Sequence, residues 1–116
     1  MDLTLSSRPG QRCTVVQAHG IIDFGTGPEL RQMLQGLRAA GVGRVVLDMT
    51  EVRLMDSSGL SVLVAMSKAF GQDGGRLCLA AVPPLVRSVL SVTSVDRIIG
   101  VYDTVTAAEQ ALAADA

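Results

Sequence analysis

The sequence predicts one α/β domain with a mixed sheet of about five strands, an N-terminal antiparallel hairpin followed by parallel strands, and about four helices. Three observations lead to this prediction. The chain has 116 residues, the usual length of a single domain. Hydrophobic residues make up 48% of it and aromatic residues only 3%, so the core must be mainly aliphatic, as in parallel strands buried under helices. Strand-like and helix-like segments alternate along most of the chain, which favours parallel strands joined by helices.

The N-terminal residues predict a β-hairpin. Leu3 and Leu5 alternate with polar residues, and the Pro-Gly pair within residues 8–11 is typical of a turn. Residues 13–19 form a second strand-like run, which we expect to end at Gly20. This hairpin supplies the antiparallel edge of the predicted sheet.

The next segment predicts a helix that begins near Thr26. Thr26 could cap the helix, Glu29 could bond back to Thr26, and Pro28 suits the first turn. Gly41 stands where a left-handed residue often ends a helix. The apolar face of this helix is predicted from residues at three- and four-residue steps, which are Leu30, Met33, Leu34 and Leu37.

The middle of the chain predicts a central strand and a buried helix. Residues 45–47 are a short, continuous apolar run, as expected of a strand covered on both faces. We expect residues 50–55 to be a loop. Residues 60–70 are too long for a typical buried strand and are followed by glycines, so they predict a largely buried helix, which we place at residues 57–70.

The C-terminal part predicts two more strands and two more helices. Residues 76–80 are a strand-like run, and the Pro-Pro pair that opens residues 83–90 can begin a helix but cannot continue a sheet. A last strand is expected within residues 99–102. The final helix would be capped by Thr104 or by Thr106.

Composition excludes several kinds of function. The net charge is −1, from ten basic and eleven acidic residues, so we expect no basic face for nucleic acid or an anionic membrane. No apolar run approaches the roughly 20 residues needed to cross a bilayer, and the first residues lack a signal-peptide pattern, so we expect a cytoplasmic protein. Cys13 and Cys78 lie in apolar runs and are expected to be reduced, with no metal bound.

The most distinctive stretch, residues 55–60, lies between the central strand and the buried helix. The first turn of a helix has unpaired N–H groups and partial positive charge, so it can accept a carboxylate, a hydroxyl or a phosphate oxygen. A phosphate on Ser57 would add about −1.5 to −2 charges there and leave the fold intact. A simpler interpretation stays open, because Asp56 or Ser57 could be only the N-cap of the helix.

Residues 45–63 resemble the signature stretch of the STAS family, in particular of its anti-sigma factor antagonists. Residues 20–23 and 29–30 are similar to the family's pattern before its first helix. The resemblance covers nearly the whole chain, so we expect residues 1–116 to form a single STAS domain. In that family the serine directly after the aspartate, here Ser57, is phosphorylated by the anti-sigma factor, a serine kinase that binds the ATP itself.

The resemblance therefore implies a partner switch. With a free Ser57 hydroxyl the protein would bind the anti-sigma factor and so release the sigma factor, and with a phosphate it would not bind. Ser58 is adjacent and chemically equivalent, so only the resemblance favours Ser57 over it. The residues that the resemblance places at the partner surface are Asp23, Asp56, Ser57, Ser58, Gly59 and Leu60.

Three positions around this surface carry open questions. Asp23 could equally be a turn residue that leads into the first helix. Ile22 stands where the family often has an acidic residue, and Ser61 where it usually has glycine. A missing carboxylate changes charge complementarity, which governs partner choice, so a diverged kinase is an alternative partner.

The sequence also bears on two other functions. A serine hydrolase is disfavoured because the chain lacks the Gly-x-Ser-x-Gly elbow and its only histidine, His19, precedes the first helix, where we expect a surface residue at a strand end. We therefore expect no enzyme, no catalytic residue, no cofactor and no small-molecule substrate. The remaining alternative is a stand-alone STAS module of a lipid-transport or larger signalling assembly, which would need no phosphorylation.

Overall fold

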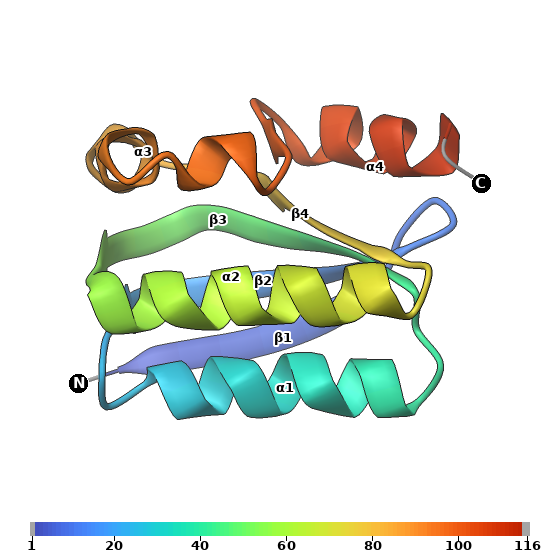
Figure 1. The fold of residues 1–116 in the computed structure, drawn as a ribbon, viewed down its shortest axis with the longest axis horizontal. Coiled ribbons are helices and arrows are strands. Elements are labelled where there is room, and N and C mark those ends of the chain that lie inside the picture. The colour runs from blue at the N-terminus through green and yellow to red at the C-terminus, as the bar shows by residue number, and fades with distance from the viewer. Residues whose placement is uncertain (1, 115–116) are drawn as a thin grey trace.

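The computed structural model describes residues 2–114 (Figure 1). Two strands open the chain, and helices and strands then alternate. The elements are β1 (Leu3–Pro9), β2 (Thr14–Ile22), α1 (Gly27–Ala39), β3 (Arg44–Met55), α2 (Ser57–Gln72), β4 (Arg76–Ala80), α3 (Pro84–Val92), the 3-10 turn η1 (Val95–Arg97), β5 (Val101–Tyr102) and α4 (Val105–Ala114).

All five strands belong to one sheet, in the order β1-β2-β3-β4-β5. β1 runs antiparallel to β2, and every other neighbouring pair is parallel. Consecutive strands are therefore neighbours throughout, as short connections favour. The predicted α/β class, with an antiparallel hairpin at one edge of a mixed sheet, is confirmed.

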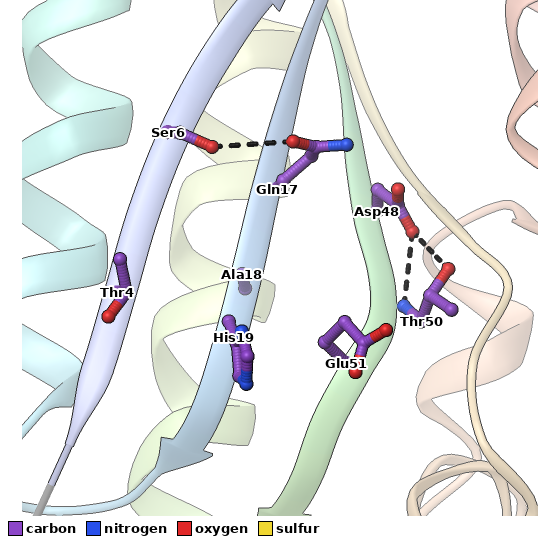
Figure 2. Close-up of a pocket in the computed structure, with 8 residues that line it drawn as sticks. All are labelled: Thr4, Ser6, Gln17, Ala18, His19, Asp48, Thr50 and Glu51. Carbon is purple, nitrogen blue, oxygen red and sulfur yellow. Dashed lines mark hydrogen bonds between the residues drawn. The ribbon is translucent and has the colours of Figure 1, made fainter.

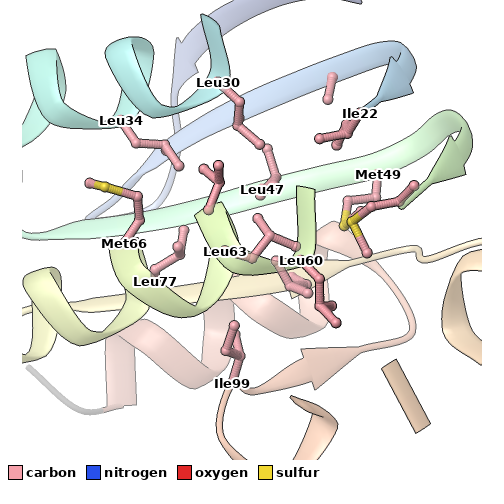
Figure 3. Close-up of a cluster of buried hydrophobic side chains, with 14 of the residues drawn as sticks. Ile22, Leu30, Leu34, Leu47, Met49, Leu60, Leu63, Met66, Leu77 and Ile99 are labelled. Atoms are coloured by element: carbon pink, nitrogen blue, oxygen red, sulfur yellow. The ribbon is translucent and has the colours of Figure 1, made fainter. Parts of the chain in front are cut away.

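Helices α1 and α2 cover one face of this sheet, and their apolar side chains form the main core (Figures 1 and 3). Leu34 and Met66 from the helices, and Leu47 and Leu77 from the strands, are at most 2% exposed. Burial of such a side chain contributes about 1.5–3 kcal/mol. The residues predicted for the apolar face of α1 all lie in this core or pack against it, namely Leu30, Met33, Leu34 and Leu37.

Helix α4 covers only part of the opposite face. Ala108 and Leu112 of α4 belong to a second, smaller cluster with Val15, Val46 and Cys78. The rest of this face is polar and borders a hollow of about 200 Å³ (Figure 2). The residues around this hollow are Thr4, Ser6, Gln17, Ala18, His19, Asp48, Thr50 and Glu51.

The prediction of a loop at residues 50–55 is wrong, because β3 continues to Met55. These residues pair with the end of β2, with Glu51 opposite His19. Val52 and Met55 are the buried residues of this stretch, so the buried positions are three residues apart and not two. Register shifts between the strands cause this spacing, which hides the alternation expected of a strand.

The prediction that Gly20 ends the second strand is also wrong, since β2 continues to Ile22. Gly20 has a φ of 124°, a conformation that glycine adopts readily. A Cβ atom at this position would lie 2.1 Å from the Asp2 carbonyl oxygen. Gly20 therefore permits an irregularity within the strand and does not terminate it.

The helix ends match the predictions only in part. Thr26 is the N-cap of α1, but its side chain makes no capping bond, so the predicted capping box with Glu29 is wrong. The final helix is capped by Thr104, whose hydroxyl oxygen accepts from the Ala107 N–H at 3.0 Å. Gly41 follows α1 with a φ of 88°, as predicted for a residue that ends a helix.

The two cysteines lie in different environments. Cys78 is buried in β4, Cys13 is half-buried before β2, and both are free thiols. Burial raises the pKa of the Cys13 thiol, and the nearby Glu109 carboxylate raises it further. Among the described residues no group of three or more His, Cys, Asp or Glu side chains is arranged to hold a metal ion.

Candidate functional site

The ends of β2 and β3 bring two loops together at one edge of the sheet. Ile22, the last residue of β2, is paired with Met55, the last residue of β3. The Asp56 N–H donates to the Ile22 carbonyl oxygen at 3.1 Å. Asp23 and Asp56 directly follow these paired residues, so the loop into α1 and the turn into α2 are neighbours, as the order of the elements predicts.

Asp56 is the N-cap of α2. Its Oδ1 accepts from the Ser58 N–H at 2.8 Å and from the Gly59 N–H at 3.2 Å. Asp56 itself has extended backbone angles, as is usual for an N-cap. The simpler interpretation of Asp56 is therefore confirmed, and its carboxylate already occupies two of the N–H groups at the start of α2.

Ser57 is the first residue of α2 and is exposed. Its carbonyl oxygen accepts from the Ser61 hydroxyl at 3.0 Å. Ser58 is half-buried, so the two adjacent serines differ in their access to solvent. Ser57 is the more accessible of the two residues.

Gly59 and Leu60 are buried beneath this surface. A Cβ atom on Gly59 would lie 2.6 Å from Ile22 Cγ2 and 2.9 Å from the Ile22 carbonyl oxygen, so only glycine lets α2 begin this close to β2. Leu60 is 9% exposed and belongs to the main core. Gly59 and Leu60 were predicted to bind the partner, but because they are buried they can support the shape of the surface and contribute little area to it.

Asp23 organises the loop that leads into α1. Its Oδ1 accepts from the N–H groups of Gly25 (2.9 Å) and Thr26 (3.0 Å). The Thr26 hydroxyl donates to the Ile21 carbonyl oxygen at 2.7 Å and accepts from the Asp23 N–H at 2.9 Å. The hydrogen bond from the Thr26 backbone is the main cause that lowers the pKa of Asp23. Its role as a turn residue is confirmed, and a further role in docking stays a prediction.

Three exposed apolar side chains near this edge were missed by the sequence reasoning. Phe24, at the tip of the Asp23 loop, is 82% exposed, Leu54 near the end of β3 is 54% exposed, and Leu85 in α3 is 70% exposed. The exposure of Phe24 could have been expected from the sequence, because this phenylalanine lies in a polar Asp-Phe-Gly turn. Large apolar side chains that face solvent near one another are typical of interaction surfaces.

Two features describe the chemistry of the turn at Ser57, which are the place of His19 and the charge of Asp56. His19 lies on the polar sheet face of Figure 2 and not in the turn at Ser57, and no serine hydroxyl in residues 2–114 is hydrogen-bonded to it. A phosphate on Ser57 would stand beside the Asp56 carboxylate. The helix start would then carry two adjacent anionic groups, a large local change in charge.

No helix within the described part of the chain is long and apolar enough to span a membrane.

Comparisons with known proteins agree with this fold. An anti-sigma F factor antagonist from Paenibacillus polymyxa is 28% identical over 104 residues, which are 89% of each chain. The crystal structure of an anti-sigma factor antagonist from Mycobacterium paratuberculosis has a TM-score of 0.87 and 27% identity, and covers 96% of this chain and 94% of its own. The Bacillus cell fate determinant SpoIIAA in its phosphorylated form has a TM-score of 0.70 and 17% identity, with 95% and 99% covered, a likeness of fold alone. The model of the STAS domain matches residues 6–108, and the chain therefore belongs to the STAS domain family.

Proposed function

We propose that this protein is an anti-sigma factor antagonist whose partner is an anti-sigma factor with serine kinase activity. In the proposed switch, the form with a free Ser57 hydroxyl binds the anti-sigma factor and releases the sigma factor. Phosphorylation of Ser57 ends this binding. The protein supplies no catalytic group, the kinase binds the ATP, and the switch operates in the cytoplasm.

One observation carries the proposal, which is the exposure of Ser57 on the first turn of α2. A kinase can reach this hydroxyl without unfolding the helix. The half-buried Ser58 is less accessible, which supports Ser57 as the modified residue. The names of the similar proteins from Paenibacillus and Mycobacterium support the same role for this chain.

The effect of phosphorylation follows from the charges around Ser57. The Asp56 carboxylate already accepts from the N–H groups of Ser58 and Gly59, so these groups are not available to a phosphate. A partner that closes over the turn would have to bury the phosphate beside this carboxylate. An unmatched buried charge costs several kcal/mol, and about 1.4 kcal/mol corresponds to a tenfold change in affinity. The affinity of the phosphorylated form for the anti-sigma factor should therefore be lower by orders of magnitude.

The proposal is tested with purified candidate anti-sigma kinases and ATP. Mass spectrometry should locate one phosphate on Ser57, and the Ser57→Ala variant should not be labelled. Ser57→Asp should bind the kinase much more weakly than Ser57→Ala does. Ser61→Ala is the matched control, because Ser61 is an exposed serine on the next turn of the same helix.

The outcome separates the proposal from its alternative. Label on neither Ser57 nor Ser58, with equal binding of the Ser57→Asp and Ser57→Ala variants, would contradict a phosphorylation switch. A STAS module of a lipid-transport or larger signalling assembly would then be favoured, and this alternative predicts binding to an assembly subunit with no dependence on Ser57.

A further inference from the structure

The end of β3 has a strand neighbour on one side only. β4 pairs with residues 44–48 of β3 and no further, whereas β2 stays paired with β3 up to Met55. β4 leaves the sheet at Ala81, which has a φ of 55°. Figure 1 shows β3 (green) extending past the end of β4 towards α3. Within residues 2–114 no strand pairs with residues 51–55 on the side of β4.

A groove follows this open strand edge. A hollow of about 430 Å³ lies between residues 50–53 of β3 and the start of α3, and Pro83, Pro84 and Leu85 line it. A second hollow of about 120 Å³ continues between Leu54 and α3, and Leu85 lines this one too. The two hollows share Leu85 as a lining residue, and we call them together the β3–α3 groove.

The groove combines the two features that an extended peptide needs. An unpaired strand edge presents backbone N–H and C=O groups to which another strand can bond. Leu54 and Leu85 are 54% and 70% exposed, and can take up alternate apolar side chains of such a strand. Pro83 and Pro84 have no backbone N–H group, so the facing wall offers no donor at these two positions.

The open edge has a defined start and end. At its start, Asp48 Oδ1 accepts from the Thr50 N–H at 3.0 Å, so this donor is already satisfied. At its end, β3 stops at Met55, because Asp56 is the N-cap of α2. The intervening residues 51–55 are long enough for a short added strand and lead directly to Ser57.

We propose that the β3–α3 groove binds an extended segment of the anti-sigma factor, which adds to the sheet as a strand beside residues 51–55. This inference rests on the proposed function, because the groove ends at the turn that carries Ser57. The segment has apolar side chains that contact Leu54 and Leu85. Charge complementarity requires an acidic residue near Arg53, which lines the groove, and a basic residue near the exposed Asp56.

The first experiment uses the complex with an anti-sigma kinase that binds the wild-type protein. Hydrogen exchange of the backbone amides in residues 51–55 should slow on binding, because an added strand would bond to this edge. The double variant Leu54→Ser/Leu85→Ser should bind at least about tenfold more weakly. Ile98→Ser is the matched control, since Ile98 is 64% exposed but lines a different hollow. Thermal unfolding should show that both variants fold.

A second experiment does not depend on the proposed function. Twelve-residue peptides are selected from a random phage library against the full chain, and their binding is measured by amide exchange and by affinity. Peptides that slow exchange at residues 51–55, and bind at least about tenfold more weakly to the Leu54→Ser/Leu85→Ser variant, support the groove even if no anti-sigma factor binds the protein.

Several results would overturn the inference. If the double variant loses binding while the amides of residues 51–55 exchange as before, the groove holds a helix or side chains alone and strand addition is wrong. Slower exchange in the free protein at higher protein concentration would assign the edge to a second copy of this chain. Selected peptides that bind elsewhere, together with unchanged kinase binding by the double variant, would exclude the groove altogether.

Discussion

Replacement of Gly59 by alanine tests the close packing that brings the start of α2 against the ends of β2 and β3. The added methyl group would lie 2.6 Å from Ile22 Cγ2, 2.8 Å from Met55 Cγ and 2.9 Å from the Ile22 carbonyl oxygen. The two side chains could shift at some cost. The carbonyl oxygen cannot, because it accepts from the Asp56 N–H.

The change in the free energy of unfolding of Gly59→Ala is the sum of two opposing effects. Insertion of a methyl group into a packed site costs typically about 1–3 kcal/mol. Alanine in place of glycine within a helix contributes up to about 1 kcal/mol in the other direction, and less in the first turn. We therefore expect Gly59→Ala to lower the free energy of unfolding by about 1–2 kcal/mol, which corresponds to a Tm lower by about 4–8 °C.

Urea unfolding followed by circular dichroism measures this difference. The matched control is Gly36→Ala in α1, where a Cβ atom would meet no other atom within 4 Å. This variant should be more stable than the wild type by about 0.5–1 kcal/mol. A Gly59→Ala protein that unfolds at the same urea concentration as the wild type, or at a higher one, would refute the argument that only glycine fits there.

Three further predictions concern stability. Asp56→Ala removes the cap of α2 and should lower the free energy of unfolding, measured in urea, by about 1 kcal/mol. Asp23 and Asp73 have lowered pKa values, mainly through hydrogen bonds from the Thr26 backbone and from Arg38. Their stabilising contribution is therefore present above the ordinary value of 3.8 and is lost as the pH falls below it, which acid titration at fixed urea should detect. Leu34→Ala should lower the free energy of unfolding, measured in the same way, by about 2–5 kcal/mol, because Leu34 is fully buried.

Each of these three predictions would be contradicted by a specific result. Asp56→Asn keeps an acceptor for the Ser58 N–H, so a loss as large as that of Asp56→Ala would show that the cap is not the cause. Asp73→Asn should reduce the loss of stability that the protein shows as the pH falls. An unchanged dependence of stability on pH would show that Asp73 does not contribute to it. Leu37→Ala should cost less than Leu34→Ala, since Leu37 is only partly buried, and equal losses would contradict the dependence on burial.

The helices were largely predictable from local sequence. Residues 60–70 are too long for a typical buried strand, and the structure places them within α2. Asp56 was one of two candidates for the N-cap of this helix, and its carboxylate accepts hydrogen bonds from the N–H groups of Ser58 and Gly59. Helix contacts join residues three or four positions apart, so the information lies within one short segment.

The strand ends were not predictable in this way. β3 continues to Met55 and β2 continues to Ile22 only because the two strands pair with shifted register. Thr26 was predicted as a side-chain cap, yet its hydroxyl bonds to the Ile21 carbonyl oxygen, outside the helix. A bulge or a loop bond depends on a neighbour that the local pattern does not contain.

For this protein, the sequence alone determined the α/β class, the order of the elements and the position of an Asp-Ser-Ser-Gly turn at a helix start, because each depends on residues close together in the chain. The tertiary structure alone decided which residues of that turn face solvent. It exposes Ser57, buries Gly59 against Ile22 and leaves one side of β3 without a strand. These properties depend on how far distant strands extend beside one another, which is set by packing and not by any local pattern.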